Sequence, residues 1–220
     1  MNCEAWGSSG WKLLHSLALH FDNNEDANHK MTKKFFISIK HLLPCIYCRR
    51  SYAQYIQELP IDPFLKEHRL SEWIYHIHNK VNDKLRNQGY TIKKNPSFRN
   101  VIRDISTFVA RHKKFIGWQF IYCIAFNYPV MKDDLSKVRY DGHLTFFKSF
   151  EHIINDKKCI AFLEKYPIEK ALVSRDTFTK WVYSLEKYVK NGKCCTYDTK
   201  CRMFEKHRVE KCKDGTCRIK

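Results

Sequence analysis

The chain has 220 residues, of which 44% are hydrophobic and 15% aromatic, and a formal net charge of +17. This composition excludes a largely disordered chain, and the lack of any run of roughly 20 apolar residues excludes a membrane-spanning protein. Seven glycines and six prolines are few, so we expect long helices rather than a turn-rich β architecture.

Four amphipathic helices are predicted in the first 90 or so residues. Apolar residues recur three or four positions apart over 11–19 and again over 35–43, where Pro44 ends the pattern. A third helix is predicted over 45–59, and a fourth begins with Ser71 as its N-cap. The expected buried stripe of the fourth helix is Trp73, Ile77, Val81 and Leu85. Four such helices predict an all-α bundle.

The second half of the sequence repeats landmarks of the first. Trp118 follows Trp11 by 107 residues, and Trp181 follows Trp73 by 108 residues, each within a similar apolar pattern. The agreement favours an ancient duplication, although two unrelated amphipathic pairs would also be compatible with it.

The two halves differ in their polar residues. His78, Asn79 and Asn82 of the first half correspond to Glu186, Lys187 and Lys190 of the second. The cysteines of the first half at 45 and 48 have no counterpart near 152–155. The second half is therefore predicted to be a degenerate helical bundle, a scaffold without its own site.

Cys45 and Cys48 form a C-x-x-C pair at the start of the third helix. The unpaired N–H groups of a helix start stabilise a thiolate, and Arg49 and Arg50 add positive charge. The three-residue step brings both sulfurs within one turn, close enough for a disulfide. A redox pair, half of a zinc site and a pair with neither role remain open at this point.

Polar residues gather around the aromatic side chains of two helices. The fourth helix carries His78, Asn79 and Asn82 near Trp73, and the first carries His15 four residues after Trp11. Each group offers a flat aromatic surface with hydrogen-bonding groups, which suits a polar heterocycle or a phosphate.

Three segments, in chain order, resemble the Erv/ALR-type FAD-linked sulfhydryl oxidases. They read W-x-x-L-H from Trp11, P-C-x-x-C from Pro44, and W-x-x-H-x-H-N-K-V-N-x-K-L from Trp73 to Leu85. The resemblance covers residues 6 to about 92. It implies a small helical bundle that binds FAD, oxidises protein dithiols to disulfides and passes the electrons to oxygen as hydrogen peroxide.

The resemblance also implies roles for individual residues. Cys48 would face the flavin, and Cys45, expected to be the more exposed sulfur, would exchange with the substrate dithiol. The FAD contacts would come from Gly7, Trp11, His15, Tyr75, His78, Asn79, Val81, Asn82, Lys84 and Tyr90. No metal ligand is expected.

The sequence also departs from the family pattern. Many relatives carry a structural disulfide at the positions that are Tyr75 and Ile92 here, and an aromatic residue where this chain has Leu43. Tryptophan-containing contacts after the fourth helix are replaced by "NPSFRNVI". The first half is therefore expected to be stabilised by packing against the second half. The resemblance to quiescin-type relatives implies that the two halves form an intrachain pseudo-dimer. A further homodimer remains open.

The final segment from Cys194 holds five of the ten cysteines. Cys212 and Cys217 flank a predicted turn, and many relatives use such a mobile dithiol as an electron shuttle. Disulfides among Cys194, Cys195 and Cys201, or a zinc site that adds His207, are the alternatives. Cys123 and Cys159 lie in apolar patterns and are expected to be inert core residues.

We therefore expect a catalytic FAD/CxxC domain at 1–95, a degenerate domain at 96–192 and a basic Cys-rich tail at 193–220. The expected substrates are protein dithiols, of a thioredoxin-like or viral protein, with oxygen as acceptor and neither membrane nor nucleic acid as partner. The lack of a leader favours a viral protein acting in the infected cytoplasm or in the virion. The alternative function is a basic zinc-binding nucleic-acid module without catalysis.

Overall fold

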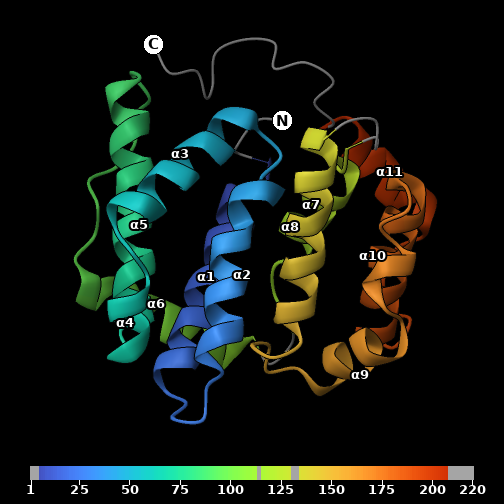
Figure 1. The fold of residues 1–220 in the computed structure, drawn as a ribbon, viewed down its shortest axis with the longest axis horizontal. Coiled ribbons are helices and arrows are strands. Elements are labelled where there is room, and N and C mark those ends of the chain that lie inside the picture. Colours follow the sequence, from blue (N-terminus) through green and yellow to red (C-terminus); the bar gives the residue numbers. More distant parts are fainter. Residues whose placement is uncertain (1–4, 113–114, 130–133, 208–220) are drawn as a thin grey trace.

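A computed structural model describes residues 5–112, 115–129 and 134–207, and within those ranges all regular secondary structure is helical (Figure 1). The helices are α1 (Gly7–Asp22), α2 (His29–Leu42), α3 (Ile46–Glu58), α4 (Asp62–Lys66), α5 (Leu70–Asn87), α6 (Phe98–Arg111), α7 (Trp118–Phe126), α8 (Asp134–Phe150), α9 (Lys157–Lys165), the 3₁₀ helix η2 (Ile168–Lys170), α10 (Arg175–Val189) and α11 (Tyr197–Glu205). In these ranges no helix combines the length and the apolar character needed to cross a membrane. The prediction of an all-α fold is confirmed.

Helices α1–α5 form the first helical group, in which α1 packs on α5, and α3 packs on α2 and α5. The predicted third helix is confirmed to within one residue, with Cys45 as its N-cap. The predicted N-cap of the fourth helix is wrong, because Ser71 lies inside α5. The carboxylate of Asp22, at the end of α1, instead accepts hydrogen bonds from the N–H groups of Leu70 (2.6 Å) and Ser71 (2.8 Å). A side chain from another helix thus satisfies the start of α5.

Helices α7–α10, with η2, form the second helical group, and their packing follows that of the first. Helix α10 packs on α7 and α9, as α5 packs on α1 and α3. The indole N–H of Trp73 donates to the carbonyl of Leu59 at 2.9 Å, and that of Trp181 donates to the carbonyl of Tyr166 at 2.9 Å. The landmarks of the sequence repeat therefore make the same long-range hydrogen bond in both groups.

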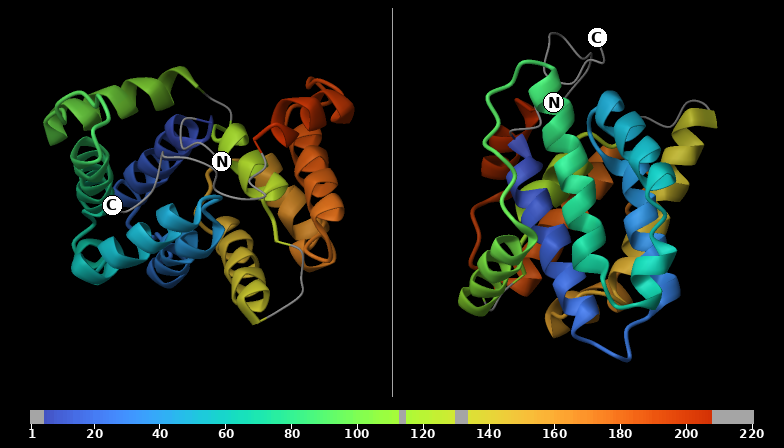
Figure 2. Two further views of the ribbon diagram at one scale, coloured as in Figure 1. Left: turned by 90° about the horizontal axis from the view of Figure 1, so that it is seen from above. Right: turned by 90° about the vertical axis from the view of Figure 1, so that its left-hand side faces the viewer.

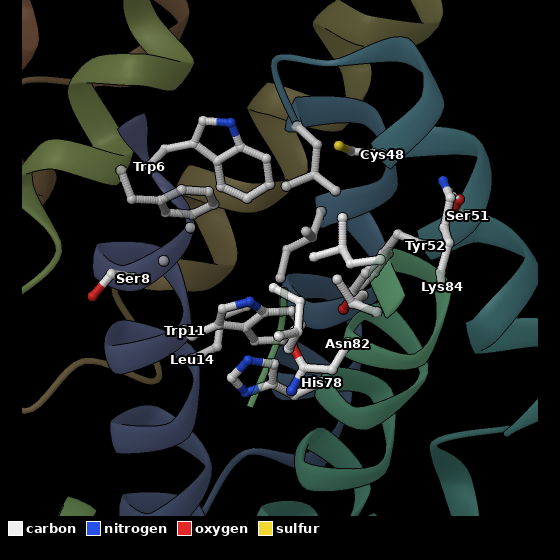
Figure 3. Close-up of a pocket in the computed structure, with 18 of the residues that line it drawn as sticks. Trp6, Ser8, Trp11, Leu14, Cys48, Ser51, Tyr52, His78, Asn82 and Lys84 are labelled. Atoms are coloured by element: carbon white, nitrogen blue, oxygen red, sulfur yellow. Dashed lines mark hydrogen bonds between the residues drawn. The ribbon is translucent and has the colours of Figure 1, made fainter. Parts of the chain in front are cut away.

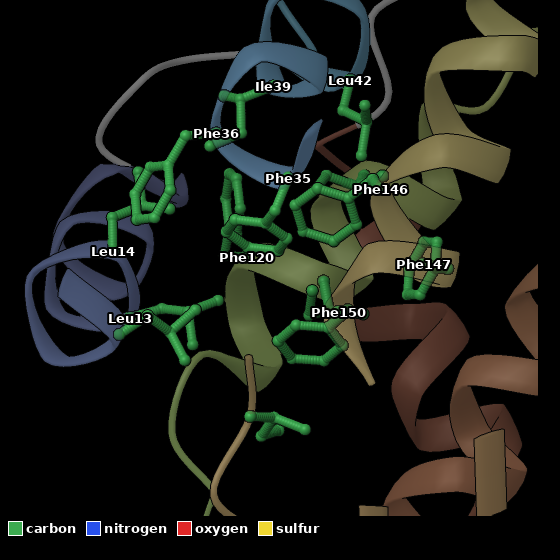
Figure 4. Close-up of a cluster of buried hydrophobic side chains, with 14 of the residues drawn as sticks. Leu13, Leu14, Phe35, Phe36, Ile39, Leu42, Phe120, Phe146, Phe147 and Phe150 are labelled. Atoms are coloured by element: carbon green, nitrogen blue, oxygen red, sulfur yellow. The ribbon is translucent and has the colours of Figure 1, made fainter. Parts of the chain in front are cut away.

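The two groups meet through α2 and α8, and through α1 and α7. Figures 1 and 2 show α7 and α8 between the first group and α9–α11. Phe35 of α2 stacks on Phe146 and Phe150 of α8, with ring centroids 4.4 and 5.6 Å apart (Figure 4). A Cβ on Gly142 of α8 would lie 2.3 Å from the Cβ of His41, so glycine is needed for this close approach. The two groups share one continuous hydrophobic core.

Two helices lie outside these groups. Helix α6 packs on α1 and α5, and none of its residues is buried. Helix α11 packs on α7, where Phe204 stacks on Tyr122 with ring centroids 4.9 Å apart. Part of the expected cysteine-rich tail is therefore a helix that belongs to the core.

Candidate functional site

A cavity of about 280 Å³ lies between α1, α5 and the start of α3 (Figure 3). It is lined mainly by apolar and aromatic side chains, as ligand sites usually are. The predicted site residues that line it are Gly7, Trp11, Cys48, His78, Val81, Asn82, Lys84 and Tyr90. The sequence segments that carry these residues are thus brought together around one cavity.

The remaining predicted site residues do not line this cavity. His15 is buried beside it, and its Nε2 lies 3.1 Å from Nδ1 of His78. Tyr75 points to the segment after α5, where its hydroxyl donates to the carbonyl of Pro96 at 3.0 Å. Asn79 is half-buried on α5 next to His78, and Cys45 is buried at the N-cap of α3.

Aromatic stacking and neutral histidines characterise the base of the cavity. The ring of Trp11 stacks on that of His78 at a centroid distance of 3.9 Å and an interplanar angle of 11°. Burial lowers the pKa of His15 to about 4, and burial together with His15 lowers the pKa of His78 to about 3. Both imidazoles are therefore neutral at pH 7, and each offers one donor and one acceptor nitrogen.

The predicted buried stripe of α5 divides into two parts. Trp73 and Ile77 are fully buried in the core, whereas Val81 and Leu85 are half-buried and line the cavity. On the same turns, the amine of Lys84 donates to the hydroxyl of Ser51 at 2.6 Å. The second half of the helix therefore forms a wall of the site rather than of the core.

Hydrogen bonds hold the segment that follows α5 against the cavity. Asn82 donates to Oδ1 of Asn95 at 3.0 Å, and Arg86 donates to the carbonyl of Lys93 at 3.0 Å. Ile92, at one of the two positions where many relatives carry cysteine, lines the cavity. Together with the hydrogen bond of Tyr75 to Pro96, these bonds hold residues 93–96 against α5. The family resemblance implies a disulfide at the Tyr75 and Ile92 positions of many relatives.

Cys48 of the C-x-x-C pair lies at the opposite end of the cavity from His78 (Figure 3). Cys48 is half-buried and lines the cavity, whereas Cys45 is only 1% exposed. The prediction that Cys45 is the more exposed sulfur is therefore wrong. The guanidinium of Arg49 donates to the carbonyls of Leu43 (2.7 Å) and Pro44 (3.1 Å), which folds the loop before Cys45 inward.

Helix α8 also closes this loop. The guanidinium of Arg139 donates to the carbonyl of His41 at 3.2 Å, at the end of α2. Together with the close approach at Gly142, this contact brings α8 against the end of α2, from which the loop over 43–45 departs. The end of α2, directly before the loop over 43–45, is thus held by a contact between distant parts of the chain.

Sequence reasoning missed three aromatic residues that line the cavity, Trp6, Tyr52 of α3 and Phe120. Trp6 lies just outside the W-x-x-L-H segment, and Phe120 belongs to the second helical group, which we expected to be only a scaffold. The repeat could have suggested that α7 lies close to α1, but no sequence signal marks a contribution to the site.

The other cysteines fall into three classes. Cys123 and Cys159 are fully buried, and burial raises the pKa of Cys123 to about 12, in agreement with an inert core role. Cys194, Cys195 and Cys201 carry free thiols. Cys212 and Cys217, the predicted shuttle pair, lie outside the described residues. Across the described ranges, no group of three or more histidine, cysteine or acidic residues could hold a metal ion.

Comparison with known proteins gives three relationships. The sequence model of the Erv1 / Alr family matches residues 8–100. The "Probable FAD-linked sulfhydryl oxidase R368" of Acanthamoeba polyphaga mimivirus is 33% identical over 125 residues, which are 55% of this chain and 83% of that protein. The "Mitochondrial FAD-linked sulfhydryl oxidase ERV1" of Saccharomyces cerevisiae is 37% identical over 84 residues, which are 38% of this chain and 44% of that protein.

A second yeast protein, "FAD-linked sulfhydryl oxidase ERV2", is 28% identical over 85 residues, or 43% of its length. The chain thus matches less than half of each yeast relative but most of the mimivirus one. No solved structure matches the chain.

Proposed function

The chain belongs to the Erv1 / Alr family, and from this premise we propose that it is an FAD-linked sulfhydryl oxidase that makes disulfide bonds in protein dithiols. Its substrates are protein thiols, and oxygen is the electron acceptor. The observation that carries the proposal is that Cys48 of the C-x-x-C pair lines the same cavity as the stacked Trp11 and His78.

The residues around the cavity fit a flavin nucleotide. Trp11 and His78 provide a flat stacked surface, and Asn82, Lys84 and the neutral His78 provide hydrogen-bonding groups. The indole N–H of Trp6 is buried in the cavity lining and has no hydrogen-bond partner among the described residues. We propose that FAD is held by Gly7, Trp11, His15, Tyr75, His78, Asn79, Val81, Asn82, Lys84 and Tyr90. His15, Tyr75 and Asn79 do not line the cavity, and they would act by supporting the residues that do.

The sulfur chemistry follows from thiol–disulfide exchange. A substrate thiolate attacks the sulfur of Cys45, the Cys45–Cys48 bond breaks, and Cys48 leaves as a thiolate. The second substrate thiolate attacks the mixed disulfide, so that the substrate becomes a disulfide and Cys45 is released. The Cys45–Cys48 disulfide must then re-form by loss of two electrons and two protons, and FAD held in the cavity would accept those electrons and pass them to oxygen, which would leave as hydrogen peroxide.

The burial of Cys45 adds a requirement to these exchange steps. A substrate thiolate must reach a sulfur that is 1% exposed, so the loop before Cys45 has to open first. We therefore propose that the loop over 43–45 gates substrate access.

We also propose that the chain is an intrachain pseudo-dimer of a catalytic domain at 1–95 and a degenerate domain at 96–192. The matching hydrogen bonds of Trp73 and Trp181 support a duplication. Equivalent helices meet between the two groups, α1 with α7 and α2 with α8, as a two-fold interface requires. A homodimer of the whole chain is a further arrangement that measurement of the molecular mass in solution would detect.

The remaining parts of the proposal concern the tail and the setting. Within the predicted basic tail at 193–220, α11 packs on the core, and we propose that Cys212 and Cys217 beyond it relay electrons from substrate to the C-x-x-C pair. The viral source of one relative motivates the further proposal that the chain acts in the cytoplasm of an infected cell or in the virion, on a thioredoxin-like or viral protein. Loss of activity towards a protein dithiol, but not towards dithiothreitol, in a Cys212→Ser variant would support the relay.

The absorption spectrum of the purified full chain tests the central proposal. We expect a yellow protein whose flavin bands bleach on addition of dithiothreitol without oxygen and return with oxygen. A colourless chain that contains zinc and does not take up FAD would contradict the proposal and favour the zinc-binding alternative, which salt-dependent DNA binding would then test.

A further inference from the structure

The end of the cavity that holds Cys48 has a wall of two aromatic side chains, Trp6 and Phe120. Trp6 immediately precedes α1, and Phe120 lies in the first turn of α7. Their ring centroids are 5.8 Å apart, and both residues line the cavity. In Figure 3, Trp6 and Cys48 lie toward one end of the cavity, and Trp11 and His78 lie toward the other. The wall is therefore at the sulfur end of the site.

Contacts between α7 and the start of α1 fix the position of Phe120. The side-chain amide of Gln119 donates to the carbonyl of Ala5, and the backbone N–H of Phe120 donates to the hydroxyl of Ser9 at 3.3 Å. A Cβ on Gly10 would lie 3.0 Å from Cδ2 of Phe120, so the ring rests against α1 where that helix has no side chain. Phe120 is fully buried as a result.

The indole N–H of Trp6 differs from those of two other tryptophans. Trp73 and Trp181 each donate to a carbonyl at 2.9 Å. Trp6 is only 8% exposed, yet its Nε1 has no hydrogen-bond partner within the described part of the chain. A buried donor without a partner costs free energy, so its position in a cavity lining points to a ligand acceptor.

We propose that Trp6 and Phe120 are cofactor-binding residues: the indole N–H of Trp6 donates a hydrogen bond to an acceptor on the flavin ring, and Phe120 holds the indole in place. The pyrimidine end of a flavin carries carbonyl and imine acceptors, which are the chemistry that such a donor recognises. The inference rests on the proposed function. It gives the second helical group a direct part in cofactor binding, because Phe120 of α7 is one of the two residues of this wall.

Titration of the flavin-free full chain with FAD tests this proposal, with Trp6→Phe as the main variant. This change keeps a ring but removes the N–H, so we expect FAD to bind roughly three- to tenfold more weakly. The visible bands of bound FAD should shift, because the flavin loses a hydrogen bond. The urea midpoint of the flavin-free chain should change little, since the N–H that is removed had no partner there.

Trp181→Phe is the matched control, and it should give the opposite pattern. Its N–H is bonded to Tyr166 in the second helical group, so the flavin-free chain should lose stability while the FAD dissociation constant and spectrum stay as in the wild type. Phe120→Leu keeps the Trp6 N–H but loosens its support, so FAD binding should weaken with a smaller spectral shift than in Trp6→Phe.

The outcomes separate the two levels of the argument. If Trp6→Phe binds FAD with wild-type affinity and an identical spectrum, the hydrogen bond does not exist and this inference is wrong. If Phe120→Leu alone behaves as the wild type, the role of Phe120 is wrong. If the wild-type chain itself binds no FAD, the proposed function fails before the inference is reached.

Discussion

The α1–α5 helix pair and the α7–α10 helix pair have matching frameworks but opposite interiors. In the first pair, His15 contacts His78 across the two helices at 3.1 Å. At the positions 107 and 108 residues further on, Tyr122 donates to Glu186 at 2.7 Å. The same cross-helix contact is therefore made by two neutral rings in one pair and by a hydroxyl and a carboxylate in the other.

Ionic and aromatic groups occupy the interior of the second pair. Lys190 and Lys200 both bind Glu186, at 2.6 and 2.8 Å. Burial raises the pKa of Glu186, but hydrogen bonds from these lysines and from Tyr122 outweigh it and hold the pKa below its ordinary value. Phe204 of α11 then covers Tyr122.

The comparison indicates what a cofactor site requires of this framework. Tryptophan hydrogen bonds and core packing are common to both groups, so they support the fold but do not make the site. In the first pair the side chains that meet are two neutral rings beside the cavity, whereas in the second pair Lys200 and Phe204 of α11 cover Glu186 and Tyr122. Removal of one partner from a buried ionic network is strongly destabilising, so the contacts of Glu186 with Tyr122 and Lys200 hold α10 to α7 and α11.

Cys48→Ala should have the largest effect, because only the first group carries the sulfur pair. We expect the variant to retain FAD while its turnover with dithiothreitol falls roughly a thousandfold or more. Cys159→Ala, a buried cysteine of α9, is the control and should keep wild-type turnover. Oxygen uptake measures both, and appreciable turnover by Cys48→Ala would remove Cys48 from the proposed exchange.

Glu186→Ala should lower the free energy of unfolding by about 3 kcal/mol, because two lysine ammonium groups lose their shared counter-ion. Urea unfolding measures this loss. Glu169→Ala removes an exposed ion pair with Lys148 and should cost less than about 1 kcal/mol. Equal losses in the two variants would show that the Glu186 network is not the stabilising feature of the second group.

The pH dependence of the free energy of unfolding should distinguish the His15–His78 contact of the first pair from the Glu186 network of the second. The pKa values of His15 and His78 are about 4 and about 3 in the fold and 6.5 when exposed, so the unfolded chain binds more protons below pH 6.5. The free energy of unfolding should then fall by about 1.4 kcal/mol per pH unit for each histidine as the pH drops from 6.5 toward 4.

Two variants test which residues cause this pH dependence of the free energy of unfolding. His78→Phe should reduce the slope between pH 6 and pH 5, whereas Glu186→Gln should leave that slope unchanged. The stabilisation from the ionised Glu186 is present above its ordinary pKa of 4.5 and is lost only at lower pH. An unchanged slope in His78→Phe would mean that His78 is not held neutral.

Tyr75→Phe should have the smallest effect. It removes a partly exposed hydrogen bond to Pro96, so we expect a loss of about 0.5 kcal/mol and slightly weaker FAD binding. Tyr188→Phe, which alters a 43% exposed tyrosine of α10, should change neither quantity. If Tyr75→Phe equals this control, the segment after α5 is held by Asn82 and Arg86 alone.

Local patterns predicted the helical class and four helices of the first group. The third helix and the end of the second helix before Pro44 agree with the structure to within one residue, because they depend on neighbours in the chain, whereas α2 begins six residues before the predicted pattern. The residues proposed to hold FAD came from the family resemblance, and eight of the predicted site residues line one cavity. The cap of α5 was missed because the N–H of Leu70 donates to Asp22, which lies 48 residues earlier in the chain.

Features that depend on distant packing were beyond prediction. Cys45 lies just after the end of α2, against which α8 packs, and Arg139 reaches His41 there from 98 residues away. The cavity wall likewise needs Phe120, 111 residues after Ser9, to which its N–H donates. A single sequence does not show which residues far apart in the chain pack together. The greater exposure of Cys48 and the place of Phe120 in the cavity lining were therefore both missed.

The stacking of Phe35 on Phe146 has a consequence for how the protein behaves at low abundance. When two separate chains form such an interface, dilution separates them and would expose the aromatic rings to water. Here a covalent connection keeps the local concentration of the two surfaces high whatever the amount of protein present. The cavity wall supplied by α7 should therefore persist at concentrations where a two-chain assembly would have fallen apart.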